Sequence, residues 1–441
     1  MTKRNFLMLQ GPIGPFFKQL AEHLTERGNS VTKVNFWGGD ETYFPTGIRF
    51  RGTISDWPNF VLRTCHSKDI TDIVLFGDRR SYHEVAIEIL SEANPEMRIW
   101  VFEEGYFRPN WITLDQYGVN ARSALPRTGR SLEQTINDLD ELTTPGSETI
   151  KPWVREFMPT AVRYYGYGYL RSDDFGPYKY HRLENPAVEA LGWVSSAIKR
   201  LIGLNDVSEM ERFRTRTADS HFVCALQLEG DFQIRKYSPY KSNQELIESV
   251  LKSFTKSGGD RFLVIKVHPY DYKWDKWRAI AHKKAEELGI ADRVAVLHKS
   301  GASELLDDCS GFVTVNSTYA LTALEKGVPV KALGNAFWNF SPITNSVDLD
   351  RFWHNPVQPK MSLFSAFKQL VMSETQINGG FYSKQGRDLC LETVASVLST
   401  KEQDTELLSR EPLQRLRETR KNKLTKVQSL MPPPKKLDIL A

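Results

Sequence analysis

The sequence has few cysteines and no long hydrophobic run, and both shortages exclude whole classes of protein. Among its 441 residues, Cys65, Cys224, Cys309 and Cys390 are scattered and form no Cys-x-x-Cys pair, which argues against a disulfide framework or a zinc site. No apolar stretch approaches the ~20 residues of a membrane span, and the apolar run after Asn5 is too short for a signal peptide. We therefore expect a cytoplasmic protein.

The sequence also lacks a strong net charge and the usual dinucleotide-binding motif. The net charge is only +4, so we expect no nucleic-acid partner. The early glycine loop, Gly11-Pro12-Ile13-Gly14, lacks the G-x-G-x-x-G order of a nicotinamide or flavin site. No Asp-x-Asp motif follows a predicted strand, so the sequence demands no metal and no cofactor besides a substrate. The glycine loop itself is either a tight turn or a direct ligand contact through Gly11 and Gly14.

The first part of the chain alternates between strand and helix patterns. Strands are predicted at 6–10, 31–36, 73–76 and 98–102, and helices at 16–27 and 82–93. This alternation predicts a doubly wound parallel sheet, which we place in a first domain of residues 1–126.

Charged and aromatic residues follow two of these strands. One strand ends in Gly77-Asp78-Arg79-Arg80, and the next in Glu103-Glu104-Gly105-Tyr106-Phe107-Arg108-Pro109. A plain surface turn needs neither two carboxylates beside an arginine nor a group of aromatic residues. The pattern therefore indicates a functional site that includes Glu103 and Glu104. Contacts to a sugar or acceptor are expected from Asp78, Arg79, Tyr106 and Arg108.

A second strand–helix series follows a segment rich in proline and tyrosine. Residues 127–215, with helix patterns at 131–142 and 188–201, are predicted to be a helical insertion, and 216–380 a second domain. Its expected strands are 222–226, 262–267, 294–297, 312–315 and 328–333, and its expected helices are 244–256, 279–288, 303–310 and 319–327. The fold class is thus α/β, with two Rossmann-like domains in a GT-B glycosyltransferase architecture.

Two loops of the second domain have the composition of a phosphate site. Lys266-Val267-His268-Pro269 ends one predicted strand, and Asn316-Ser317-Thr318 joins another to a helix. The carboxyl ends of parallel strands converge on a ligand, and cations, hydroxyls and a helix start favour an anion. Glu325, about two helical turns beyond Ser317, would contact a ribose or lie on the surface.

A second acidic strand end carries Gln227, Glu229 and Asp231. Sugar transfer requires a carboxylate to act on the acceptor hydroxyl, and retention of configuration often requires a second one at the anomeric carbon. If the two domains face each other, this acidic end and Glu103-Glu104 flank one sugar. The two acidic ends and two phosphate loops together predict a nucleotide-sugar transferase.

Residues 381–441 are predicted to form C-terminal helices and a basic tail. Residues 402–429 combine leucines with several lysines and arginines, a composition typical of helices on anionic membranes. The alternative is a solvated helix packed on the catalytic domain, or a disordered tail. We expect peripheral association with the inner-membrane surface.

Four motifs in order resemble the capsule polysaccharide biosynthesis/export family of Gram-negative bacteria, and the single-module length resembles its KpsS/LipB type. They are Glu103 to Thr113, Gln227-Leu228-Glu229-Gly230-Asp231, Lys266-Val267-His268-Pro269 and Asn316-Ser317-Thr318. The resemblance runs from about Phe6 to Val394. It implies a β-Kdo transferase that uses CMP-Kdo with retention and places the first Kdo on phosphatidylglycerol, starting a poly-Kdo linker.

The same resemblance implies roles for single residues. Asp231 matches the nucleophile and Glu104 the acid near the acceptor and donor sugar. The implied CMP-phosphate loops contain Lys266, His268, Ser317 and Thr318, and Glu325 matches the ribose contact. Partners implied are CMP-Kdo, a phosphatidylglycerol-type lipid and other capsule assembly proteins.

Two other functions remain open. A non-catalytic export or scaffold protein would bind the lipid-linked polymer and would not need a phosphate loop facing two acidic strand ends. A GT-B enzyme with another donor, such as CMP-sialic acid or a UDP-sugar, would need the same loops. A measured affinity for CMP separates the scaffold from the enzymes.

Overall fold

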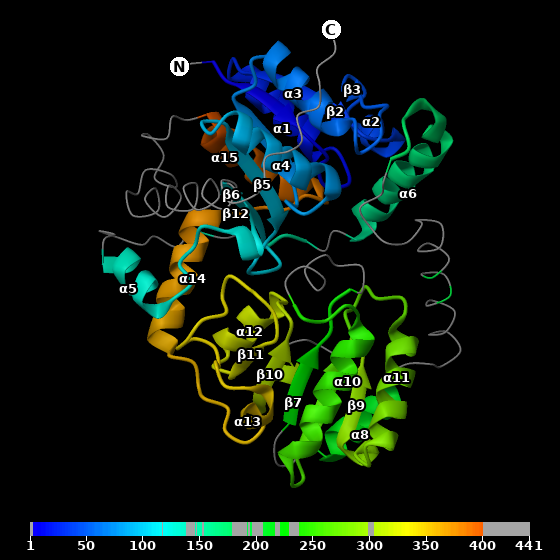
Figure 1. Cartoon of the computed structure of the whole chain (residues 1–441), viewed down its shortest axis with the longest axis vertical. Helices are drawn as coiled ribbons and strands as arrows, with labels where there is room; N and C mark the ends of the chain where they lie inside the picture. Colours follow the sequence, from blue (N-terminus) through cyan, green and yellow to red (C-terminus); the bar gives the residue numbers. More distant parts are fainter. Residues whose placement is uncertain are drawn as a thin grey trace.

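The computed structural model describes most of both domains (Figure 1). The described residues are 3–116, 118–137, 146, 148–151, 154–178, 192, 195, 206–216, 221–228, 238–298 and 304–399. Glu229, Asp231, the basic tail and all but two residues of the helix expected at 188–201 lie outside these ranges. Within them, no helix combines the length and the apolarity that a membrane crossing requires.

The first sheet has seven strands in the order β12-β6-β5-β4-β1-β2-β3. The strands are β1 (Asn5–Met8), β2 (Ser30–Asn35), β3 (Ile48–Arg49), β4 (Asp72–Phe76), β5 (Arg98–Glu104), β6 (Trp111–Gln116) and β12 (Gln376–Asn378). The first five are parallel, whereas β6 runs antiparallel to β5 and β12 antiparallel to β6.

Helices cover both faces of this sheet, because its strands are apolar on both sides. The helices are α1 (Phe16–Glu26), α2 (Gly38–Tyr43), α3 (Trp57–Ser67), α4 (Ser81–Ala93), α6 (Val154–Leu170) and α15 (Lys384–Ser399). Phe6 and Met8 of β1 pack with α1 and α15, and the alternate residue Leu7 packs with α3 and α4. Because successive side chains of a strand point to opposite faces, the sheet has a separate hydrophobic core on each face.

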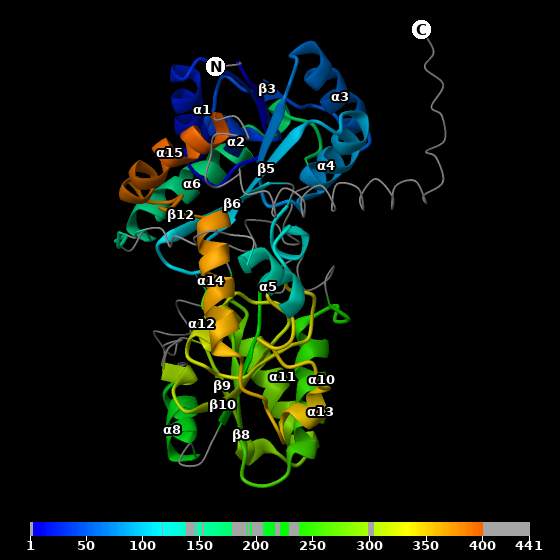
Figure 2. The ribbon, with the colours of Figure 1, turned by 90° about the vertical axis from the view of Figure 1, so that its left-hand side faces the viewer.

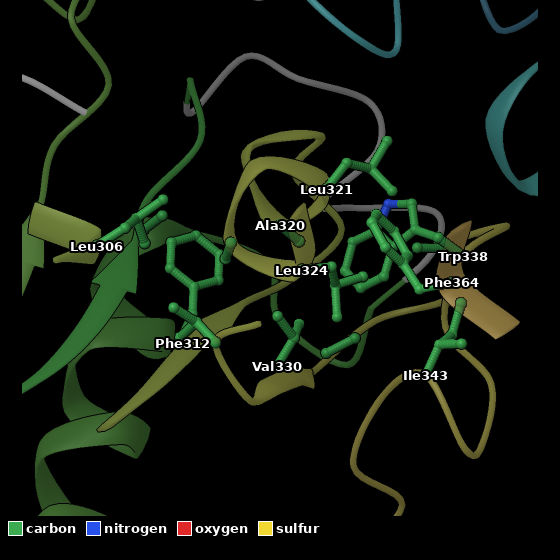
Figure 3. Close-up of a cluster of buried hydrophobic side chains, with 14 of the residues drawn as sticks. Leu306, Phe312, Ala320, Leu321, Leu324, Val330, Trp338, Ile343 and Phe364 are labelled. Carbon is green, nitrogen blue, oxygen red and sulfur yellow. The ribbon is translucent and has the colours of Figure 1, made fainter. Parts of the chain in front are cut away.

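The second sheet is all parallel, in the order β11-β10-β7-β8-β9. Its strands are β7 (His221–Ala225), β8 (Phe262–Lys266), β9 (Val294–Leu297), β10 (Cys309–Thr314) and β11 (Val330–Ala332). The associated helices are α5 (Gly129–Asn137), α8 (Val207–Arg216), α10 (Asn243–Phe254), α11 (Trp274–Glu287), α12 (Tyr319–Glu325), α13 (Leu349–Phe352) and α14 (Met361–Thr375). Figure 3 shows the buried cluster of α12, with Phe312 and Val330 below it and Phe364 of α14 beside it.

Short 3-10 turns complete the described elements. They are η1 (Asn120–Arg122), η2 (Ser172–Asp174), η3 (Thr255–Ser257), η4 (Ala291–Arg293) and η5 (Glu304–Leu306). The last of these replaces the helix predicted at 303–310, since β10 already begins at Cys309.

The two sheets share one strand topology. In each, the first strand of the domain lies at the centre, between the second and the fourth. The strand order therefore reverses between β1 and β4 in the first sheet and between β7 and β10 in the second, and ligands bind outside the carboxyl ends at such points. The prediction of two Rossmann-like domains in the GT-B arrangement is confirmed, with the loops of both domains facing each other (Figures 1 and 2).

The predicted domain boundaries need correction at the helical segment. Residues 127–215 do not form one insertion: α6 packs on α2 of the first domain, and α8 packs on β9 of the second. Leu132 of α5 is fully buried in the core that contains α12 and α14. The apolar face of α6 thus packs on the first domain, and those of α5 and α8 pack on the second.

The boundary at 380 is also wrong. Gln376 to Asn378 were expected in the second domain, but they form β12, which pairs with Trp111 to Thr113 of the first sheet. The following helix α15 packs on α1. Helix α14 carries the chain from the second domain back to the first, as Figure 2 shows.

Candidate active site

A β-hairpin of the first domain projects between the domains. The predicted strand at 98–102 extends to Glu104, which pairs with Ile112 of the antiparallel strand β6, a strand that the sequence reading missed. Tyr106 and Phe107 at the hairpin tip belong to the buried core of the second domain. The Tyr106 ring lies 4.3 Å from that of Phe337, centroid to centroid. The tip is therefore an apolar anchor between the domains.

Glu104 lies where this anchor begins. Its carboxylate oxygen Oε1 accepts a hydrogen bond of 2.6 Å from the Tyr382 hydroxyl, and its main-chain carbonyl accepts one of 2.9 Å from Thr113 Oγ1. The residue is only partly buried. A carboxylate held at one oxygen and partly open to solvent suits proton transfer with a substrate.

Arg108, beyond the anchor, faces the second domain. Burial, followed by the nearby Arg108 guanidinium, lowers the pKa of His268 to about 4. Burial raises the pKa of Tyr270, the Arg108 charge lowers it and the Glu104 charge raises it. Glu104 and Arg108 of the first domain therefore lie within electrostatic range of the second-domain loop that carries His268 and Tyr270.

The loop that carries His268 is held in shape by hydrogen bonds. The main-chain N–H of Tyr270 donates to His268 Nδ1 at 3.2 Å, so Nε2 carries the proton of the neutral ring. The His268 carbonyl accepts from the Asp271 N–H, and His298 Nε2 lies 3.1 Å from the Pro269 carbonyl oxygen. His268 therefore presents an N–H donor of defined orientation.

Lys266 was predicted to contact the donor phosphate, and the structure places it differently. Its side chain is buried, and its ammonium donates to the carbonyl oxygens of Val267 (3.1 Å) and His298 (2.5 Å). Burial lowers the pKa of Lys266 to about 8. In this structure the ammonium ties the ends of β8 and β9 together rather than pointing into the loops.

Gln227 organises the reversal point of the second sheet. Its side-chain Oε1 accepts from the Asn316 N–H at 3.2 Å, and its carbonyl accepts from Asn243 Nδ2 at 2.7 Å. Ser317 Oγ in turn accepts from the Tyr319 N–H, and Thr318 is the last residue before α12. The ends of β7 and β10 are thus joined, and Gln227, predicted as a sugar contact, supports the loop in this structure.

Other predicted site residues make contacts within the protein. Glu325 forms an ion pair with Lys368 (2.6 Å) at the far end of α12. Tyr106 is 2% exposed, and its hydroxyl accepts from the Asn120 N–H. Asp78 Oδ2 accepts from the Val119 N–H, and Arg79 pairs with Glu84. The structure assembles none of these side chains with Glu104 and His268.

The reversal point of the first sheet has its own polar network. Arg80, the neighbour of the predicted Arg79, donates to Gln10 Oε1 (2.9 Å) and to the Gly11 carbonyl (3.2 Å). Gly11 cannot carry a side chain, because a Cβ there would lie 2.7 Å from the Phe17 ring, and Gly14 has a positive φ of 121°. Both glycines therefore have a conformational role in the turn after β1.

Two residues of the site were missed by the sequence reading. Tyr270 follows the Lys-x-His-Pro motif directly and could have been included as part of that loop. Tyr382 is 278 positions away from Glu104 along the chain, and no local pattern marks it. Among the described residues, no group of three or more His, Cys, Asp or Glu side chains could hold a metal ion.

The hairpin tip depends on glycine at position 105. A Cβ at Gly105 would lie 2.2 Å from the Trp111 carbonyl oxygen, so Gly105→Ala must open the hairpin. We expect a loss of about 1–3 kcal/mol in unfolding free energy, measured by thermal denaturation. Gly166→Ala on α6, where nothing lies within 4 Å of the Cβ, is the matched control and is expected not to destabilise the protein. Equal stability of the two variants would contradict the argument.

The pKa of His268 provides a test of the cross-domain contact. Removing the like charge in Arg108→Gln is expected to raise that pKa from about 4, as followed by NMR titration of the imidazole ring. Arg130→Gln, at an exposed position of α5, should leave the pKa of His268 unchanged. Because the folded pKa lies below the ordinary value of 6.5, His268 contributes stability above pH 6.5 that is lost as the pH falls toward 4. An unchanged titration in Arg108→Gln would rule out the contact.

Comparison with known proteins identifies a family that the chain matches. Residues 71–382 match the family model described as capsule polysaccharide biosynthesis protein. The capsule polysaccharide modification protein LipB of Neisseria meningitidis serogroup B is 33% identical over 390 residues, which cover 87% of this chain and 93% of that protein. The capsule polysaccharide export protein KpsS of Escherichia coli is 32% identical over 387 residues, covering 87% and 98%.

A solved structure is similar at lower identity. The beta Kdo 2,7 transferase of Thermosulfurimonas dismutans KpsC aligns with 14% identity and a TM-score of 0.44, covering 89% of this chain and 97% of that one. The matched residues 71–382 include the hairpin with Glu104 and Arg108, the loop of His268 and the loop of Asn316. The chain belongs to the capsule polysaccharide biosynthesis family.

Proposed function

We propose that this chain is a retaining β-Kdo transferase that moves Kdo from CMP-Kdo to a phosphatidylglycerol-type lipid and so starts the poly-Kdo linker of a capsular polysaccharide. One observation carries the proposal: the first-domain hairpin that contains Glu104 and Arg108 is anchored by its tip in the core of the second domain, within electrostatic range of His268. A binding scaffold for a finished polymer does not require such an arrangement. Transfer from a nucleotide sugar requires both a carboxylate and nitrogen donors.

The donor half of the reaction uses the second domain. When the glycosidic bond to CMP breaks, negative charge develops on the departing phosphate. The Nε2–H of His268 and the Arg108 guanidinium are positioned to donate to that phosphate, and a bound anion favours the protonated imidazole. CMP is therefore expected to bind more tightly as the pH falls from 7 toward 5.

The acceptor half uses the hairpin. In the proposed double displacement, the Asp231 carboxylate attacks the anomeric carbon and CMP leaves with the bonding electrons. The acceptor hydroxyl then attacks the same carbon, Glu104 takes its proton, and the bond to Asp231 breaks to restore the carboxylate. Two inversions give net retention.

Family membership and the ordered motifs support the donor and acceptor proposed here. The relatives are named for capsule polysaccharide modification and export, which agrees with a lipid-linked glycan at the inner-membrane surface. We propose that the basic tail, residues 402–429, provides the contact with anionic lipid.

The test combines purified protein, CMP-Kdo and vesicles that contain a fluorescent phosphatidylglycerol, with the lipid examined by mass spectrometry. A mass gain of one Kdo is expected. CMP-sialic acid and a UDP-sugar are tested in parallel, since product from either would replace CMP-Kdo as the donor. Absence of product together with absence of CMP binding, measured by calorimetry, would favour a non-catalytic export protein.

A further inference from the structure

The C-terminal part of the described chain returns to the first domain and places a tyrosine against Glu104. The Tyr382 hydroxyl donates to Glu104 Oε1 at 2.6 Å. That distance is in the range of a charge-assisted hydrogen bond, which is shorter and stronger than a neutral one.

The backbone before Tyr382 is fixed to the hairpin of Glu104. Asn378 Nδ2 and the Gly379 N–H both donate to the Asn110 carbonyl oxygen, at 2.8 and 3.0 Å. Gly379 has a φ of 152° and a Cβ there would lie 2.3 Å from Cys390 Cβ, so glycine is required for this approach. Strand β12 and the Gly379 turn therefore set the distance between Tyr382 and Glu104.

The Tyr382 ring is fixed as well. It lies 4.9 Å from the Phe157 ring of α6, with an interplanar angle of 70°, and 6.0 Å from Phe381. Burial, together with the Glu104 charge, raises the pKa of Tyr382 well above its ordinary value, so the phenol remains a donor at every pH at which the protein works. Aromatic neighbours of this kind restrict the direction of the O–H group.

The charged groups around the pair come from several elements. Glu103 and Glu104 of β5 raise the pKa of Tyr382, whereas Arg80, after β4, lowers it. From the second domain, Tyr270 lies within the field of both Glu104 and Arg108. Glu103 Oε1 accepts from the Glu104 N–H at 3.0 Å and is thereby directed toward the backbone.

We propose that Tyr382 is a positioning residue that holds Glu104 Oε1 so that Oε2 faces the acceptor hydroxyl. This inference rests on the proposed function. The phenol stays neutral throughout: it forms no bond to substrate, and the proton of the acceptor moves to Glu104.

The experiment is a double-mutant cycle of wild type, Tyr382→Phe, Glu104→Gln and the double variant. Tyr382→Phe is expected to lower kcat about 10- to 100-fold with little change in the KM for CMP-Kdo, because the carboxylate loses the O–H donor that orients it. In the Glu104→Gln protein, Tyr382→Phe should have no further effect on kcat. Tyr43→Phe is the control, since it removes a first-domain phenol that donates to the Thr160 carbonyl oxygen at 2.9 Å.

The outcomes separate the inference from the proposed function. An unchanged kcat in Tyr382→Phe, with an active wild type, would overturn the positioning role. An inactive wild type would count against the proposed function alone. In that case a second cycle, with Glu104→Ala in place of Glu104→Gln so that the acceptor is removed, decides the inference by thermal unfolding: non-additive changes in Tm support the Tyr382–Glu104 coupling, and additive changes overturn it.

Discussion

Glu104→Gln is expected to lower kcat by about 10²- to 10⁴-fold, because an amide cannot take the proton of the acceptor hydroxyl. The substitution keeps the size of the side chain and its acceptor for Tyr382, so the hydrogen bond of 2.6 Å can persist. The affinity for CMP should be unchanged, since the phosphate contacts proposed for His268 and Arg108 do not involve Glu104. The measurement is initial-rate kinetics with CMP-Kdo and lipid acceptor, beside CMP calorimetry.

Glu84→Gln is the matched control for this prediction. Glu84 lies on α4 and pairs with Arg79, so its loss tests the general effect of one removed carboxylate in the same domain. A wild-type kcat in Glu104→Gln would exclude Glu104 as the base. Loss of CMP binding together with kcat would assign it to the donor site instead.

The second large effect concerns Asp231. Asp231→Asn is expected to reduce transfer by about 10³-fold or more, because the amide is no nucleophile for the anomeric carbon. Asp231 comes four positions after Gln227, whose side chain joins the ends of β7 and β10. Gln227 lies just after the carboxyl end of β7, and ligands of such sheets bind outside the carboxyl ends of the strands.

A covalent intermediate gives this prediction a direct readout. Glu104→Gln protein mixed with CMP-Kdo and lipid should accumulate Kdo on the peptide that contains Asp231, since the second displacement lacks its base. Peptide mass spectrometry detects the adduct, and Asp231→Asn protein should show none. Asp260→Asn, on the surface of the same domain, is the control and should retain activity. Near-normal transfer by Asp231→Asn would exclude the nucleophile role.

Much of the fold could be predicted because buried parallel strands have a strong local signal. Runs such as Phe6-Leu7-Met8 and Val264-Ile265 are apolar at consecutive positions, which only a strand covered on both faces uses in so short a length. The antiparallel strands β6 and β12 were missed, because Trp111 to Gln116 mixes polar and apolar residues and β12 has only three residues. The strands with which they pair are decided by tertiary packing at the edge of the sheet.

The site could be predicted only in part, because residue type does not determine where a side chain points. Arg79 and Arg80 are adjacent and chemically identical, yet the first pairs with Glu84 and the second reaches Gln10 and Gly11. Lys266 ends a strand as predicted, but its ammonium turns to backbone carbonyls because the strand is buried on both sides.

The two Rossmann-like sheets, the loops at their carboxyl ends and the resemblance to capsule polysaccharide proteins could all be predicted from the amino-acid sequence. These depend on local apolar patterns and on motifs of a few neighbouring residues. The hydrogen bond between Tyr382 and Glu104, and the position of Arg108 within electrostatic range of His268, depend on the tertiary structure. These interactions join residues from distant parts of the chain. The packing of α14, β12 and α15 produces no periodic sequence pattern around those residues.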